Sequence, residues 1–165
     1  MRLLLPPSRT VRGEAGALAP LDRYTGTLYK ALGVDGLTAA QRRYAVDAIL
    51  IHTAEEGLRG ADGSVPPPLA ELVAVDEAVI DLRSKEYARR DPLPVGGWTV
   101  RVVSPGEGGR RLAISHWNKH HKGVFVGALV ADMPSIRTIE DLLRWAAAND
   151  HQLEPVADGE LDLVV

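Results

Sequence analysis

The sequence contains no cysteine among its 165 residues. Disulfide bonds and thiolate chemistry are therefore excluded, and a reducing compartment fits this composition. Aromatic residues make up only 5% of the chain, so aliphatic side chains must build most of the core. The apolar run at residues 2–5 ends at Pro6 and is too short for a signal peptide or a membrane span. We therefore expect a cytoplasmic protein that does not enter a membrane.

The chain also lacks a strong excess of charge of either sign. Its 19 Lys and Arg against 22 Asp and Glu give a net charge of -3. Nucleic-acid binding would therefore need a local basic patch rather than an overall positive charge. The sequence has no Gly-x-Ser-x-Gly elbow, Walker loop or Gly-x-Gly-x-x-Gly fingerprint. A serine hydrolase is thus poorly supported, and we predict no cofactor.

What is present is a globular composition, with 45% hydrophobic and 25% charged residues, which predicts a single domain over residues 1–165. Periodicity and turn signals predict strands at residues 2–5, 48–51, 75–82, 98–103, 111–115, 152–156 and 160–165. They predict helices at residues 24–32, 39–47, 84–90, 117–130 and 138–148, and loops at 8–20 and 57–68. The expected fold is α/β, a mixed β-sheet flanked by helices with a C-terminal β-hairpin.

Local signals fix three helix ends in this prediction. Thr38 and Thr138 each begin a capping-box pattern, and Gly33 follows the helix at residues 24–32 as its C-cap. At the C-terminus, the Asp158-Gly159 pair is a typical two-residue hairpin turn.

The first polar cluster is the segment 115–123, which holds three histidines and two lysines. It lies where a predicted strand gives way to a helix, and a helix start offers free N–H groups to an anion such as phosphate. Lys119 and Lys122 are three residues apart and would share one helix face. The alternative is an ordinary solvated helix face, because charge runs usually lie at the surface.

His116 and His120 are four residues apart, a spacing that can place two imidazoles on one helix face for a metal. The acidic residue that the zinc-protease pattern needs between them is absent, and the flanking lysines would repel a cation. We therefore predict no metal site.

The second polar cluster is the segment 81–87, Asp-Leu-Arg-Ser-Lys-Glu-Tyr, which follows a predicted buried strand. Arg83 and Ser84 would lie at the carboxyl end of that strand, where ligands usually bind in α/β sheets. The alternative is that Asp81 and Arg83 form a structural pair while Ser84 caps a helix. Both interpretations stay open from the sequence.

Five segments resemble the YaaA (peroxide stress protein) family in the same order. They are residues 4–10, the Tyr-Thr-Gly motif at 24–29, residues 79–87, the Ser-His-Trp-Asn-Lys-His-x-Lys-Gly motif within 114–123, and residues 159–165. The motif at 114–123 is the most specific. Several blocks of the family are short or missing here, and the lysine of the first motif is replaced by nearby Arg9. The chain therefore resembles a shortened member with internal deletions.

The resemblance implies a mixed α/β fold, a role in the response to hydrogen peroxide, and DNA binding in a positively charged cleft. Carried over residue by residue, the resemblance implies a cleft lined by Ser8, Thr25, Arg83, Ser84, Ser115, Asn118, Lys119 and Lys122, with Arg9 in place of the missing lysine. Arg59 is a weaker match.

Three functional interpretations follow. The first is a stress protein whose cationic cleft binds DNA or another phosphate-bearing ligand, with Trp117 stacking on a base. The second is a small enzyme acting on a metabolite that bears phosphate or sulfate, with His116 or Lys119 as acid or base. The third is a partner subunit that joins a second copy or a longer paralogue.

Overall fold

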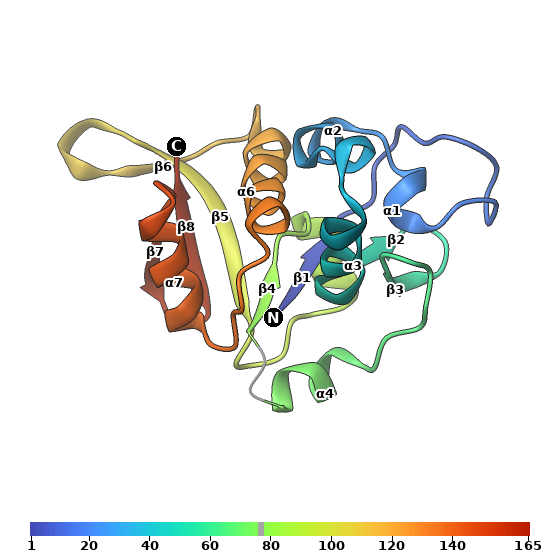
Figure 1. The fold of residues 1–165 in the computed structure, drawn as a ribbon. Helices are drawn as coiled ribbons and strands as arrows, with labels where there is room; N and C mark the ends of the chain where they lie inside the picture. Colours follow the sequence, from blue (N-terminus) through green and yellow to red (C-terminus); the bar gives the residue numbers. More distant parts are fainter. Residues whose placement is uncertain (76–77) are drawn as a thin grey trace.

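The computed structural model describes residues 1–75 and 78–165, whose strands form one eight-stranded mixed sheet (Figure 1). The order is β3-β2-β1-β4-β5-β8-β7, and β6 pairs with β5. The strands are β1 (Arg2–Leu5), β2 (Ile49–Thr53), β3 (Gly57–Gly60), β4 (Val79–Asp81), β5 (Trp98–Pro105), β6 (Arg111–Ala113), β7 (Gln152–Ala157) and β8 (Glu160–Val164). β1, β2, β4, β5 and β8 run parallel to one another, so their carboxyl ends meet at one edge of the sheet.

Helices cover both faces of this sheet. They are α1 (Pro20–Arg23), α2 (Thr27–Leu32), α3 (Ala39–Ala48), α4 (Leu69–Ala74), α5 (Lys85–Arg90), α6 (Asn118–Asp132) and α7 (Ile139–Ala148), with 3-10 turns η1 (Val34–Gly36) and η2 (Glu107–Gly109). Figure 1 shows α2, α3, α6 and α7 in front of the strands. Among the described residues, no helix is both long and apolar enough to cross a membrane.

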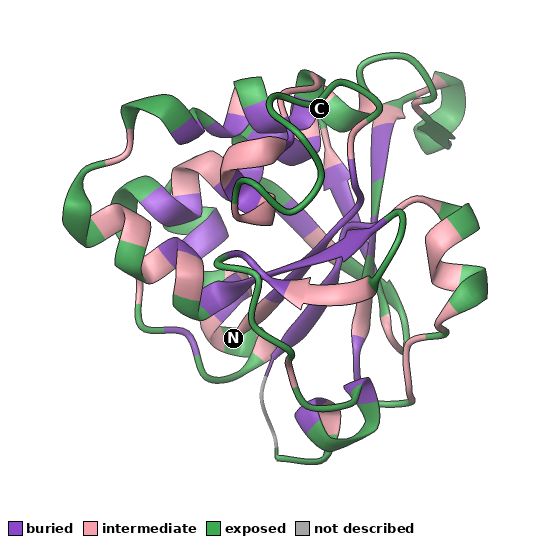
Figure 2. Ribbon diagram, turned by 90° about the vertical axis from the view of Figure 1, so that its right-hand side faces the viewer, coloured by how far each residue is buried: buried purple, intermediate pink, exposed green. Residues whose placement is uncertain are grey.

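In β1, β2 and β4, successive apolar side chains alternate between two apolar clusters, as the pleat requires. In β1, Leu3 and Leu5 join the larger cluster under α2, α6 and α7, whereas Leu4 joins a smaller one on the opposite face. Leu69 and Leu72 of α4 cover that smaller cluster. Figure 2 shows the buried residues concentrated in the strands between the helices. The mixed α/β fold and its C-terminal hairpin confirm the fold expected from the sequence.

The predicted helix ends are also confirmed. Thr38 and Thr138 both form complete capping boxes, and Gly33 is left-handed with a φ of 81°. The hairpin of β7 and β8 turns at Gly159, whose φ is 73°.

The sequence-based prediction was wrong in the segment 57–74. Residues 57–60 form β3, antiparallel to β2, where a loop was expected, because pairing with β2 supplies hydrogen bonds that no local pattern indicates. α4 follows where the sequence predicted no helix. The strand expected at 75–82 is confirmed only at Val79–Asp81, and Asp76 and Glu77 lie outside the described residues. The helix expected from Tyr24 begins at Thr27, after the separate α1.

Candidate functional site

A cleft of about 470 Å³ lies at the carboxyl edge of the parallel strands. We call it the carboxyl-edge cleft. The loop after β1, the loop after β2, the start of α5 and the start of α6 all reach it. Its lining residues are Pro7, Ser8, Arg9, Val11, Arg23, Tyr24, Ala54, Glu55, Ser84, Glu86, Tyr87 and Lys119. Loops after parallel strands are where α/β proteins usually bind ligands, so the fold itself points to this edge.

Close helix packing brings Ser8 and Lys119 to the same cleft. Gly123 of α6 lies directly against the main chain of Leu28 in α2, so any Cβ at this position would collide with the Leu28 carbonyl. Gly26, just before α2, is in turn packed against the Ser8 side chain. Ser8 Oγ also accepts a hydrogen bond from the Thr10 amide at 3.1 Å. The two glycines thus allow α6, α2 and the loop after β1 to approach closely.

The start of α6 has an unusual backbone. Trp117 occupies the N-cap position in the left-handed region with a φ of 64°, and its side chain makes no capping hydrogen bond. Such a conformation is uncommon for a large side chain and is often found at functional sites. The first turn of this 15-residue helix therefore presents N–H groups without a side-chain cap, with Lys119 within that turn.

The cleft carries charges of both signs. Arg9 and Lys119 make no ion pair within the described residues, so their charges are available to a ligand. Arg23 instead lies 3.9 Å from Glu55, measured from Nη1 to Oε2. Glu86 adds a second carboxylate to the wall and pairs with Arg90 at 2.6 Å. The cation-rich part of the cleft is thus confined to the Arg9 and Lys119 side.

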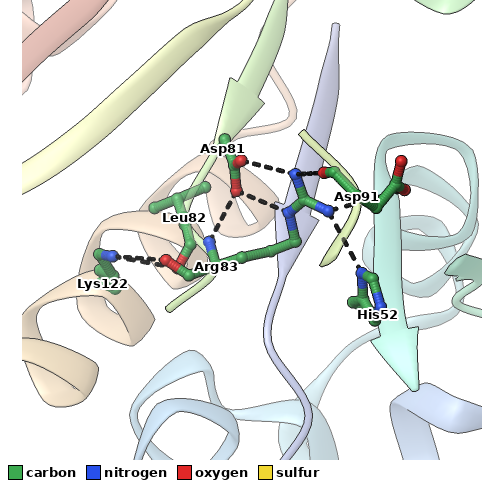
Figure 3. Close-up of polar contacts among 6 residues, drawn as sticks. All are labelled: His52, Asp81, Leu82, Arg83, Asp91 and Lys122. Atoms are coloured by element: carbon green, nitrogen blue, oxygen red, sulfur yellow. Dashed lines mark hydrogen bonds and ion pairs between the residues drawn. The ribbon is translucent and has the colours of Figure 1, made fainter. Parts of the chain in front are cut away.

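Arg83 is buried and is not part of the described lining of the cleft; Figure 3 shows it among its polar partners. Its Nε and Nη2 donate to the two carboxylate oxygens of Asp81 at 3.0 and 2.8 Å. Nη2 also donates to the Asp91 carbonyl, and Nη1 lies 3.2 Å from His52 Nδ1. The structural pair of Asp81 and Arg83 is therefore the interpretation that the geometry supports.

Lys122 is also buried, one turn after Lys119 on α6. Its Nζ donates to the main-chain carbonyl of Leu82 at 3.0 Å and to that of Arg83 at 3.4 Å (Figure 3). Burial lowers the pKa of this ammonium group to about 8, although Asp81 nearby opposes the shift. Lys122 thus fastens α6 to the end of β4 and does not share an exposed face with Lys119.

The remaining predicted residues differ in position, and of this set only Ser84 belongs to the described lining of the cleft. Ser84 lines it and precedes α5, but its side chain makes no capping hydrogen bond. Thr25 lies in a separate hollow beside α2, and the Asn118 amide donates to the Ile114 carbonyl at 3.1 Å. Ser115 and His116 are exposed just before α6. Arg59, the weaker match, lies on β3 and pairs with Glu56 at 3.6 Å.

Sequence reasoning missed several residues of the site. Arg23, Tyr24, Glu55 and Tyr87 line the cleft. Tyr24 and Tyr87 belong to the motifs quoted above, so those motifs held a usable signal. His52 is buried against Arg83. No sequence signal pointed to it, because in the sequence it is only one polar residue within an apolar strand.

No protein-family model matches the chain. It is 34% identical over 164 residues to a UPF0246 protein of Corynebacterium efficiens, covering 84% of this chain and 66% of that protein. It is 34% identical over 148 residues to a UPF0246 protein of Corynebacterium glutamicum, covering 76% of this chain and 60% of that protein. A UPF0246 protein of Streptomyces coelicolor is 30% identical over 167 residues, which is 79% of this chain and 63% of the relative.

The chain thus spans a little under two thirds of the length of these relatives. The matched region includes most of the sheet and helices described above, since it covers 76–84% of the chain. On this similarity, the chain belongs to the UPF0246 family, which includes YaaA.

Proposed function

We propose that the carboxyl-edge cleft binds a phosphate-bearing ligand, with the phosphate between Arg9, Lys119 and the start of α6. The observation that carries this proposal is that Arg9 and Lys119 line one cleft and have no ion-pair partner within the described residues. Uncapped N–H groups at the start of α6 add partial positive charge at the same place. The hydroxyls of Ser8 and Ser84 supply further hydrogen-bonding groups.

The carboxylates of the cleft favour a ligand with one phosphate group at this position. Glu55 and Glu86 line the walls beyond the two free cations. A chain of phosphodiesters running through the whole cleft would meet these negative charges. A terminal phosphate on a compact molecule would face only Arg9, Lys119 and the helix start.

Nucleic acid is the second candidate, and it is supported by Trp117. This side chain is 61% exposed and lies two residues before Lys119. The rings of His116 and His120 stand edge-on to it, each with a centroid separation of 5.6 Å. Aromatic side chains beside lysine are typical of sites where single-stranded bases stack. In this arrangement Trp117 holds a base while Lys119 neutralises the adjoining phosphate.

A role in the response to hydrogen peroxide remains part of the proposal through the YaaA resemblance. A strain lacking this chain should grow more slowly than the parent in peroxide, and the wild-type gene should restore growth. The same complementation with Lys119→Gln links the cleft to that role. Equal peroxide resistance in the deletion strain and its parent would contradict the stress role. It would not test the binding proposal.

Titration calorimetry with a mononucleotide, a single-stranded oligothymidylate and a duplex at low salt tests the binding proposal. Binding should weaken in Lys119→Gln and should fall as salt is added. A mononucleotide that binds as well as the oligomer favours the compact ligand, whereas binding of the oligomer alone favours nucleic acid. If none of the three binds at low salt, the proposed function is wrong.

A further inference from the structure

The short helix α5 forms one wall of the carboxyl-edge cleft but has little apolar contact to hold it. It has six residues, none of which is buried. Two of its residues, Glu86 and Tyr87, line the cleft. Its end is held by Arg83, whose Nη2 donates to the Asp91 carbonyl at 2.9 Å. Segments with few buried apolar contacts open easily, so polar contacts decide whether α5 stays docked.

His52 on β2 is the member of this network whose charge changes near neutral pH. A guanidinium group only donates hydrogen bonds, so His52 Nδ1, 3.2 Å from Arg83 Nη1, must be the acceptor. His52 is therefore neutral and carries its proton on Nε2. Its ring also packs on Tyr87 of α5, with centroids 5.0 Å apart. His52 thus joins the buried arginine to the cleft wall.

Charged groups of both signs face His52. Burial is the main cause that lowers the pKa of His52, and Arg83 and Arg90 lower it further, while Asp91 and Asp81 oppose them. A proton on Nδ1 would point at an Nη1 that also donates, in a place where the Arg83 side chain is 0% exposed. The contact would then be lost, because neither group can accept and both are positive.

We propose that the protonation state of His52 controls whether α5 stays docked, and we call this arrangement the latch. The neutral imidazole keeps α5 docked through Arg83 and Tyr87. The protonated imidazole releases α5 and opens the cleft wall. This inference rests on the proposed function, since the wall formed by Glu86 and Tyr87 belongs to the cleft assigned to the phosphate-bearing ligand. Ligand affinity would then change with pH in a way that the ionisation of the phosphate does not explain.

Amide hydrogen exchange of the full chain tests the latch without any ligand. The amides of Ala88 and Asp91 donate to the carbonyls of Ser84 and Tyr87, at 3.0 and 3.2 Å. Their protection, corrected for the intrinsic effect of pH, should be lost as the pH falls below about 6.5, because burial lowers the pKa of His52 from that ordinary value. In the same range, the ring resonances of His52 should titrate with the same midpoint.

His52→Asn keeps an acceptor oxygen near the Nδ1 position but cannot take up a proton. Its α5 amides should therefore keep their protection over the whole range. His151→Asn is the matched control, because burial also lowers the pKa of His151, which stacks on Trp145 away from α5. This variant should lose protection at α5 as the wild type does.

Two results would overturn the latch. One is acid-induced loss of protection that persists in His52→Asn. The other is a His52 titration in the wild type that leaves the Ala88 and Asp91 amides unchanged, a result that does not depend on how well any variant folds. A cleft that binds none of the phosphate probes contradicts the proposed function but leaves both of these measurements valid.

Discussion

Lys122 of α6 donates from its Nζ to the main-chain carbonyl of Leu82, 3.0 Å away at the end of β4. The contact joins residues that are 40 positions apart in the sequence. It fixes the first turns of α6 against the strand end that leads to Ser84. Lys119 and Ser84 consequently line the same cleft from different elements. The sequence suggested Lys122 as a phosphate ligand, but in the structure its hydrogen bond links two walls of the cleft.

Lys122 should make stability depend on pH in the alkaline range. Its pKa falls from 10.5 to about 8 on folding, so between these values the unfolded chain binds more protons than the folded one. The free energy of unfolding therefore rises with pH in this window. Relative to Lys122→Met, the wild type should gain roughly 2 kcal/mol from about pH 8 to about pH 10, measured by urea unfolding.

Lys30→Met is the control for that experiment, because Lys30 is exposed on α2. It should follow the wild-type dependence on pH. A gap between wild type and Lys122→Met that stays constant with pH would show that the ammonium group is not desolvated in the fold.

Arg83→Met should destabilise the fold strongly. The substitution leaves the Asp81 carboxylate, which is only 1% exposed, without its charged partner. Breaking a buried ion pair from one side costs about 3–5 kcal/mol. Chemical denaturation at neutral pH measures this loss directly.

Two further variants test whether the loss of stability in Arg83→Met comes from burial or from the unpaired charge. Arg90→Met removes an exposed arginine that pairs with Glu86, and it should cost less than about 1 kcal/mol. Adding Asp81→Asn to Arg83→Met should recover part of the loss, since the unpaired charge is then gone. A double variant that is as unstable as the sum of the two single variants would argue against the pair.

Gly123→Ala should separate α6 from α2. The added methyl group would collide with the Leu28 carbonyl and approach the Ala31 Cβ to 2.8 Å. Overpacking of this kind costs typically about 1–3 kcal/mol, and the shift of α6 should also displace Lys119 and weaken phosphate binding. Gly36→Ala is the matched control, because a Cβ there meets nothing within 4 Å. Equal melting temperatures for the two variants would contradict the close packing.

Lys119→Gln should reduce the affinity for a phosphate-bearing probe and reduce its dependence on salt. If Lys119 contacts one phosphate, the slope of log affinity against log salt for an oligonucleotide should fall by about 1. Lys30→Gln serves as the control, because Lys30 lines a separate hollow and is not part of the described lining of the cleft. An unchanged salt slope in Lys119→Gln would remove this lysine from the site.

Much of the local structure could be predicted because its causes lie within a few residues. Thr38 and Thr138 begin helices because their side chains cap the amides three residues later. β3 could not be predicted, because its hydrogen bonds depend on pairing with β2. For the candidate site, residue types and strand ends pointed to the sheet edge at which the structure has the carboxyl-edge cleft. The exposure of each cation did not follow from them.

The sequence by itself determined the mixed α/β pattern, the capped helices, the terminal hairpin and the family motifs. Only the tertiary structure decided which of the predicted cations line the cleft and which are buried. Arg9 and Lys119 line the cleft, whereas Arg83 and Lys122 are buried by segments far away in the chain, with His52 lying 31 positions from Arg83. The burial of a side chain depends on which distant elements pack over it. Short-range sequence patterns do not contain that information.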